Sequence, residues 1–353
     1  MVSEKSKIYG VDNVGQSAPT LTRTDSAIGR TVTVGASEIK SDFDRCYPWS
    51  DMHEVVDELG NVFIRIPKFY SRITKNANGT YKHQLSGYRY DGFTTLFVDG
   101  KGNEIDYVLV GKYEASGTSA KAESKSGKTC LVNVTLPQMR TACKANGEGY
   151  QQYDFLIDAI IKELFLIEMA TTNSQSIMYG YANGNSAAVQ TGRTDGVKTA
   201  SGSDTSNTDG KHACKYRGIE NPWGNVWKWC DGINFQEDGN TEKVYICLDP
   251  TKYESDKYIS PYMYVADTVY DNGGYLSKIE YFDKFPLLGY TVAEDGANNS
   301  YYCDYSYNCG NSVLRVGGDW SSGLRAGLWR WYGDGGSSSS SSYVGGRLCY
   351  KPL

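Results

Sequence analysis

The chain has 353 residues, with 36 lysines and arginines against 41 aspartates and glutamates, and a formal net charge of −5. A chain of this length can bury a large core in one domain or two. The near-neutral balance without a basic stripe argues against a nucleic-acid partner. No apolar run is long enough to cross a bilayer, so membrane insertion is not expected. The amino end shows no signal-peptide pattern, and we expect a protein made in the cytoplasm.

Nine cysteines are scattered singly along the sequence, without a CxxC pair. Together with the missing secretion signal, this spacing predicts free buried thiols and not a disulfide framework. Zinc is not expected, because His53, His83 and His212 lie at no ligand spacing from a cysteine pair. The 29 tyrosines are typical either of a recognition surface or of a β-rich fold with aromatic strands.

The first part of the chain predicts a small β-rich module. Val62, Ile64 and Ile66 alternate with other residues, which is the period of a half-buried strand. Pro67 ends that strand or places it at a sheet edge. The stretches NANGTY and VDGKGNE carry the Asn-Gly and Asp-Gly pairs of tight hairpin turns.

Residues from 105 onward predict a strand, IDYVLVGKYEAS, and then two helices. Thr135 is a candidate N-cap for the first helix. In the second, Leu156, Ile160, Leu164 and Ile167 recur at helical spacing. The stretch from 181 to 209 is rich in glycine, serine, threonine and asparagine, and predicts a long loop.

Aromatic strands with glycine and asparagine turns follow from residue 216 to the end. In NPWGNVWKWCDG, the strand period puts Trp227 and Trp229 on one face, and the preceding turn places Trp223 beneath them. Three tryptophans so close together are expected in the core, since each removes a large apolar area from water. The predicted fold class is α+β, with two helices packed on antiparallel strands.

The closing stretch, GGDWSSGLRAGLWRWYGDGGSSSSSSYVGGRLCY, combines tryptophans with a run of serines. A strand period of two places Leu328, Arg330 and Tyr332 on one face. The other face then holds Trp329 and Trp331, which we expect to be buried. The face with the arginine and the tyrosine is therefore predicted to meet solvent.

The serine run at 337–342 is predicted to be a surface loop and not a linker. The segment VGGRLCY is expected to return as a strand, with Val344 and Leu348 in the core. Trp320 is expected to point inward.

The sequence shows no catalytic constellation. A Ser-His-Asp site is not expected without a GxSxG elbow, and no phosphate-binding loop of the GxxxxGK[ST] type is present. Carboxylates such as Asp154 and Glu168 are assigned to the solvated faces of the helices.

Four motifs carry a resemblance to a known family: KYEAS (112–116), NPWGNVWKWCDG (221–232), VLRVGGDW (313–320) and GGRL (345–348). In this order they resemble the C-type-lectin-like fold shared by formylglycine-generating enzymes and the variable proteins of diversity-generating retroelements. The resemblance covers roughly residues 105–350. The amino-terminal IYGVDNVGQSAPTLTRTDSAIG, with PWSDM and IPKFY, is similar to tail-associated proteins of phages and prophages from gut-type bacteria.

The formylglycine-generating branch implies a copper site with reactive cysteines after the Gly-Gly-aromatic motif. The segment from 319 to 342 contains no cysteine, which argues against a thiolate copper site. The resemblance also implies a calcium site, but Lys228 replaces the acidic residue of the GNVWEW motif. No cofactor is therefore predicted, and a calcium ion is left as a possible but unsupported ligand.

The variable-protein branch fits the carboxyl end better. Rewriting the adenines of asparagine-type codons gives Ser, Gly, Asp, Tyr, Arg or Leu, but never Lys, Glu, Gln or Met. None of the latter four occurs from 319 to 349, although that depletion already begins near residue 295. A low-complexity segment is the alternative interpretation of this pattern.

The resemblance implies two units: a phage-tail-like module at 1–104 and a C-type-lectin-like ligand-binding domain at 105–353, with a variable region at about 312–348. The implied function is non-catalytic binding of a host-surface protein or glycan by a phage or prophage tail-tip adhesin. Its implied place is the virion tail, with other tail subunits as partners. A homo-oligomer, such as a trimer, is a possible assembly, and the sequence does not fix the oligomeric state. The alternatives are a divergent formylglycine-generating-type oxidase and a purely structural tail protein.

The predicted ligand contacts lie on the variable surface: Asp319, Ser321, Ser322, Arg325, Arg330, Tyr332, Asp334, Gly335, Gly336, Ser337, Ser338, Ser339, Ser340, Ser341, Ser342 and Tyr343. Rigid tyrosines and arginines are the expected anchors, with serines and glycines as permissive positions. The predicted buried framework is Trp223, Trp227, Trp229, Trp320, Trp329 and Trp331.

Overall fold

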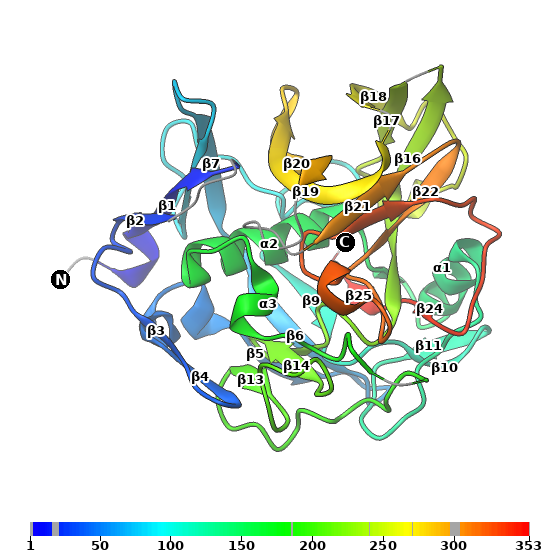
Figure 1. Cartoon of the computed structure of the whole chain (residues 1–353), viewed down its shortest axis with the longest axis horizontal. Coiled ribbons are helices and arrows are strands. Elements are labelled where there is room, and N and C mark those ends of the chain that lie inside the picture. Colours follow the sequence, from blue (N-terminus) through cyan, green and yellow to red (C-terminus); the bar gives the residue numbers. More distant parts are fainter. Residues whose placement is uncertain are drawn as a thin grey trace.

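The computed structural model describes residues 3–15, 21–184, 186–239, 241–269, 271–296 and 304–352. It is rich in β-strands and has few helices (Figure 1). The α-helices of the described residues are α1 (Leu136–Lys144), α2 (Phe155–Met169) and the single turn α3 (Ser174–Ile177), and the other helical segments are short 3-10 turns. No helix within these ranges is long and apolar enough to span a membrane.

Two of the sheets contain the first four strands of the chain. One has the order β2–β1–β8–β7, from β1 (Ile8–Val14), β2 (Thr22–Asp25), β7 (Tyr70–Lys75) and β8 (Tyr81–Ser86). The other has the order β15–β14–β13–β4–β3, from β3 (Val32–Val34), β4 (Glu38–Ser41), β13 (Ser201–Ser203), β14 (Cys214–Tyr216) and β15 (Ile219–Glu220).

A third sheet joins distant parts of the chain. Its order is β12–β25–β9–β6–β5, from β5 (His53–Val56), β6 (Val62–Pro67), β9 (Tyr107–Gly111), β12 (Tyr150–Gln152) and β25 (Leu348–Tyr350). Beside it, β10 (Ser116–Thr118) and β11 (Lys121–Glu123) form a hairpin. Pro67 ends β6, as predicted, and that strand lies inside the sheet between β5 and β9.

The largest sheet carries the carboxyl-terminal part of the chain. Its order is β18–β17–β16–β22–β23–β21–β19–β20, from β16 (Trp227–Asp238), β17 (Thr241–Ile246), β18 (Met263–Val269), β19 (Asp271–Phe282), β20 (Phe285–Gly296), β21 (Tyr305–Asn308), β22 (Ser312–Val316) and β23 (Trp331–Gly333). The short β24 (Val344–Gly345) pairs with β16. Val344 and Leu348 are buried, as predicted.

The helix α2 occupies the centre of the molecule (Figure 1) and packs against β1, β8, β16 and β20. Its predicted apolar positions are buried, and so is almost every other side chain on it. The expectation of solvated carboxylates on this helix is wrong, because Asp154 and Glu168 are fully buried. Asp154 accepts hydrogen bonds from Lys351 Nζ at 2.7 Å and Tyr253 OH at 2.9 Å. Glu168 accepts from Arg217 Nε at 2.9 Å, so each buried charge has a partner.

The helix α1 begins where the sequence predicts. Thr135 Oγ1 accepts the Gln138 backbone N–H at 3.3 Å, and Gln138 Oε1 accepts the Thr135 N–H at 3.0 Å. This reciprocal pair is a capping box, which satisfies two backbone donors that the helix itself leaves unpaired.

The two predicted units share sheets and a core. The strands β5 and β6 from the first unit pair in one sheet with β9, β12 and β25 from the second, and β3 and β4 share a sheet with β13. The main cluster of buried side chains likewise contains Tyr9 and Trp49 together with Trp223 and Trp329. The segment before residue 105 is therefore part of the platform that supports the carboxyl-terminal strands.

Candidate binding face

The predicted tryptophan framework is buried, with one exception. On the α2 side of the large sheet, Trp223 and Trp329 each meet the ring of Phe165 edge-on, with centroids 5.7 Å apart. Trp331 meets the ring of Phe235 with centroids 6.2 Å apart. Large aromatic side chains packed in this way contribute several kcal/mol of stability, about 3–5 kcal/mol each. This layer forms a rigid base under residues 319–343.

The remaining tryptophans lie elsewhere. Trp227 and Trp229 are buried in a second cluster beside α1, and the Trp229 indole donates to the carbonyl of Val134 at 2.9 Å. Trp320 was expected inside but is only half-buried. It lies in the turn that follows β22, where its backbone N–H donates to the carbonyl of Asn225 at 3.0 Å.

A row of four side chains crosses the large sheet on the face opposite Trp331. Strand pairing sets Trp229 beside Arg315, Arg315 beside Tyr332, and Tyr332 beside Tyr307. Trp229 is fully buried and Arg315 nearly so, whereas Tyr332 and Tyr307 are half-buried. The row therefore leads from the core to the surface of the molecule.

Arg330 was predicted to lie in solvent, and this is wrong, because only 4% of the residue is exposed. The extended strand begins at Trp331, and the residues before it form a turn in which the Arg330 N–H donates to the carbonyl of Gly327 at 3.3 Å. The guanidinium lies over the ring of Trp227, 4.4 Å from its centroid. Leu328, assigned to the same face, is buried as well.

Two more predicted contact residues are buried instead of exposed. Asp319 is 5% exposed and Ser322 is 6% exposed. Asp319 Oδ1 accepts hydrogen bonds from the Ser321 N–H at 2.7 Å and from Ser322 Oγ at 3.1 Å. The two side chains are buried because they close the turn after β22. Ser321 and Arg325, in the same segment, are exposed as predicted.

The serine run is a surface loop between β23 and β24, and in Figure 1 it passes beside α1. The backbone N–H groups of Asn133 and Leu136 donate to the carbonyls of Ser341 at 2.9 Å and Ser337 at 3.2 Å. The exposed predicted residues here are Asp334, Ser338, Ser340, Ser342 and Tyr343, and the half-buried ones are Gly335, Gly336, Ser337, Ser339 and Ser341. Two backbone hydrogen bonds thus anchor the loop, the Ser337 hydroxyl adds a side-chain bond to Asp256 Oδ2 at 2.9 Å, and the other side chains alternate toward solvent.

We define the arginine–tyrosine cluster as Tyr305, Tyr307, Arg315, Arg330 and Tyr332. The guanidinium of Arg330 lies 5.5 Å from the ring centroid of Tyr332 and 6.0 Å from that of Tyr305. The ring centroids of Tyr307 and Tyr332 are 5.3 Å apart. Arg315 lies over the rings of Trp229 and Tyr332 and forms an ion pair with Asp334.

Burial changes the ionisation of groups in and beneath this cluster. It lowers the pKa of Arg330 to about 10, with a further contribution from nearby Arg325. Burial also lowers the pKa of Arg315. Below the cluster, burial raises the pKa of Asp304 to about 8, against the opposing effect of the Trp329 N–H that donates to its Oδ2 at 2.5 Å. Asp304 is therefore largely protonated at neutral pH.

Lys228 stands where the GNVWEW motif of the resemblance has an acidic residue, so an ammonium group occupies this position. Lys228 Nζ donates to the carbonyls of Val226 at 3.0 Å and Gly224 at 3.1 Å, and lies 3.5 Å from Glu114 Oε1. Because these oxygens already contact the positively charged ammonium group of Lys228, the residues present do not fit a calcium ion. Burial lowers the pKa of Lys228 to about 8, so it is still mostly charged at neutral pH.

The cysteines are free and dispersed, as predicted for the eight that the structure describes. Cys309 is half-buried and the other seven are buried, whereas Cys303 lies outside the described residues. Within the described ranges, no three residues of the metal-ligating types His, Cys, Asp and Glu form a group that could hold a metal ion. The eight described thiols therefore do not gather into a thiolate donor set of the kind that a copper site uses.

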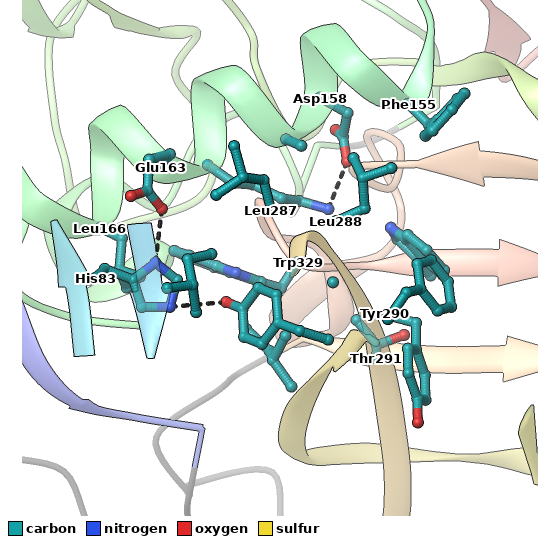
Figure 2. A pocket seen from close by; sticks show the side chains of 18 of the residues that line it. His83, Phe155, Asp158, Glu163, Leu166, Leu287, Leu288, Tyr290, Thr291 and Trp329 are labelled. Carbon is teal, nitrogen blue, oxygen red and sulfur yellow. Dashed lines mark hydrogen bonds and ion pairs between the residues drawn. The ribbon is translucent and has the colours of Figure 1, made fainter. Parts of the chain in front are cut away.

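A small cavity lies between α2, β8 and the β19–β20 hairpin, and Figure 2 shows its lining. His83 contacts Glu163 Oε2 through Nδ1 at 2.6 Å and Tyr281 OH through Nε2 at 3.0 Å. On the same helix, Lys162 pairs with Asp158 at 2.5 Å. The cavity measures about 40 Å³, which holds a few water molecules and not a substrate. These polar groups tie the hairpin to the central helix.

Sequence reasoning missed Tyr305, Tyr307 and Arg315. Tyr305 and Tyr307 alternate with Ser306 and Asn308, a strand signal that marks one face. Their partner strand β23 is more than twenty positions away, and only the parallel pairing of β21 with β23 brings Tyr307 beside Tyr332.

No protein-family model matches the chain, and no curated protein matches it in sequence. Solved structures do match it. Its structural neighbours include tropism determinants and a variable protein. Major Tropism Determinant U1 Variant aligns with 99% of this chain and 73% of its own, at 11% identity and a TM-score of 0.34.

Major Tropism Determinant I1 Variant covers the same shares at 12% identity and a TM-score of 0.35. Treponema denticola variable protein 1 aligns with 85% of this chain and 99% of its own, at 10% identity and a TM-score of 0.39. TM-scores of 0.34 to 0.39 are too low to carry a functional argument, and the function is inferred from the residues of the chain itself.

Proposed function

We propose that the chain is a non-catalytic binding protein that displays a diversified surface and recognises a host-surface molecule as a phage or prophage tail adhesin. The carrying observation is the contrast between the two sides of residues 319–343. Trp329 and Trp331 are buried on one side, whereas Ser321, Arg325 and the loop at 334–343 reach solvent on the other. Such a surface can change its residues without disturbing the base beneath it.

The physical reason is the difference in cost between the two kinds of position. Exposed substitutions away from special features change stability by about ±0.5 kcal/mol. Binding residues on loops held by a rigid scaffold follow the same arrangement as antibody paratopes. In this proposal residues 105–353 form a C-type-lectin-like domain, residues 1–104 attach it to the tail, and the adhesin assembles as a trimer.

The test compares one substitution on the face with the same substitution elsewhere. Ser340→Trp adds a large side chain at an exposed loop position, and Ser119→Trp adds it at an exposed turn between β10 and β11. We expect both variants to keep the wild-type melting temperature within a few degrees. Only Ser340→Trp should lose binding of the labelled protein to cells of related bacterial strains. Equal binding by both variants would refute the assignment of the face.

Diversification has its own test, which also separates the adhesin from a purely structural tail protein. We expect the neighbouring DNA to hold a near-copy of the codons for residues 312–348 beside a reverse transcriptase gene. Copies of the gene from sister strains should differ at the exposed positions and keep Trp329 and Trp331. Uniform drift along the gene would favour the structural role.

A further inference from the structure

The buried guanidinium of Arg330 has unmet hydrogen-bonding capacity. Its Nε and Nη1 are buried and have no hydrogen-bond acceptor. A buried charged donor without an acceptor costs free energy, because the group has lost its hydrogen bonds to water. Most buried polar groups in proteins do have a hydrogen-bond partner, so the unpartnered guanidinium of Arg330 needs an explanation. Packing alone does not supply one, because an apolar side chain of similar length would fill the same space without the cost.

The carboxyl groups that act electrostatically on Arg330 are those of Asp319 and Asp304, and neither accepts a hydrogen bond from its Nε or Nη1. Asp319 accepts the hydrogen bonds that close its own turn, and Asp334 pairs with Arg315. Asp304 is largely protonated at neutral pH, because burial raises its pKa to about 8. Exposed Arg325 lies close enough to lower the pKa of Arg330, and it forms no ion pair within the part of the chain described. Two guanidinium groups near the centre of the face therefore lack an anion.

The surroundings of Arg330 suit a partner that arrives from solvent. The half-buried rings of Tyr305 and Tyr332 lie 6.0 Å and 5.5 Å from its guanidinium, whereas the closer ring of Trp227 is buried. A carboxylate can reach the guanidinium only if a neighbouring side chain rotates, and such side-chain changes are common when partners bind. Arg325 is exposed to solvent, so its positive charge can attract an approaching anion toward the buried Arg330.

We propose that the arginine–tyrosine cluster, together with Arg325, binds a carboxylate of an acidic polypeptide segment, and that Arg330 is its central anchor. This rests on the proposed function and names the ligand chemistry of the same face. A guanidinium and a carboxylate match in a planar, two-bonded geometry. Tyrosine, tryptophan and arginine together are typical of the energetic centres of protein–protein contacts, which favours a polypeptide over an anionic glycan.

The experiment measures binding of the full chain to an array of synthetic peptides in which glutamines are replaced stepwise by glutamates. Heparin serves as the anionic glycan probe. We expect binding to rise with glutamate content and to weaken with added salt. Arg330→Met should reduce binding of the glutamate-rich peptides about tenfold or more, since bonds to charged groups are the stronger kind. Arg89→Gln, which removes an exposed arginine paired with Glu104, is the matched control and should bind like the wild type.

Stability of the same variant separates a binding role from a structural one. Because Met removes a buried charge without a hydrogen-bond acceptor, Arg330→Met should unfold at the same urea concentration as the wild type or at a higher one. A large drop in the unfolding midpoint would show that Arg330 holds the fold, and would overturn the proposal. Equal binding of glutamine and glutamate peptides, or binding of heparin alone, would overturn it too. Loss of cell binding by Ser340→Trp would still support the proposed function in either case.

Discussion

The protonated carboxyl of Asp304 predicts a distinct pH dependence of stability. Its ordinary pKa of 3.8 rises to about 8 in the folded protein, chiefly through burial. Between these values the folded chain holds one proton more than the unfolded chain. The free energy of unfolding then falls by about 1.4 kcal/mol for each pH unit as pH rises. This contribution is fully present below the unfolded pKa and is lost as pH passes through about 8.

Replacing the carboxyl by an amide isolates the effect. Asp304→Asn keeps an oxygen for the Trp329 N–H but has no proton to lose. From pH 6 to pH 8, the wild type should lose about 2 kcal/mol more of its unfolding free energy than the variant does. Urea titrations followed by tryptophan fluorescence at several pH values measure this difference, and other titrating groups cancel because both proteins share them.

The exposed Asp91→Asn is the matched control, and its curve should run parallel to that of the wild type. Parallel slopes for the wild type and Asp304→Asn would refute the reasoning, because the carboxyl would then titrate alike in the folded and unfolded chains.

Three further outcomes test the framework. Trp329→Ala should cost about 3–5 kcal/mol in urea unfolding, because it removes a buried ring that meets Phe165; a loss below 1 kcal/mol would place that ring outside the core. Thr135→Ala should cost about 1 kcal/mol, because it removes the capping box of α1, and Thr135→Ser should restore most of that loss. In the native protein, the half-buried Cys309 should react with a thiol reagent faster than the buried Cys349, and the reverse order would contradict the burial of these two residues.

Features fixed by local chemistry could be predicted from the sequence. The capping box at Thr135 needs only a hydroxyl and an amide three residues apart, and both lie in the local sequence. The burial of Trp223, Trp229, Trp329 and Trp331 agrees with the prediction from their large apolar area, whereas Trp320, with the same ring, is only half-buried. The surface loop at 337–342 could also be predicted, because a tryptophan-containing segment precedes the serine run and the strand-like VGGRLCY follows it.

The errors arose where distant segments decide the outcome. The strand period assigned Arg330 to solvent, but Gly327 lies so close to Asp304 that an added Cβ would be 1.7 Å from its Oδ1. That close approach turns the chain before β23, and the period holds only from Trp331 onward. Glu168 was assigned to solvent because its partner Arg217 is far away in the sequence. Neither contact has a local signal.

The anchoring of the serine loop has a consequence for how the protein can evolve. Both anchoring donors are backbone N–H groups, of Asn133 and Leu136, and both acceptors are backbone carbonyls, of Ser337 and Ser341. Every residue type carries that carbonyl, proline included. The loop therefore keeps these two attachment points whatever side chains its own codons specify. Mutations in the loop codons can therefore change which side chains the loop presents, while the two backbone hydrogen bonds that position the loop are inherited unchanged.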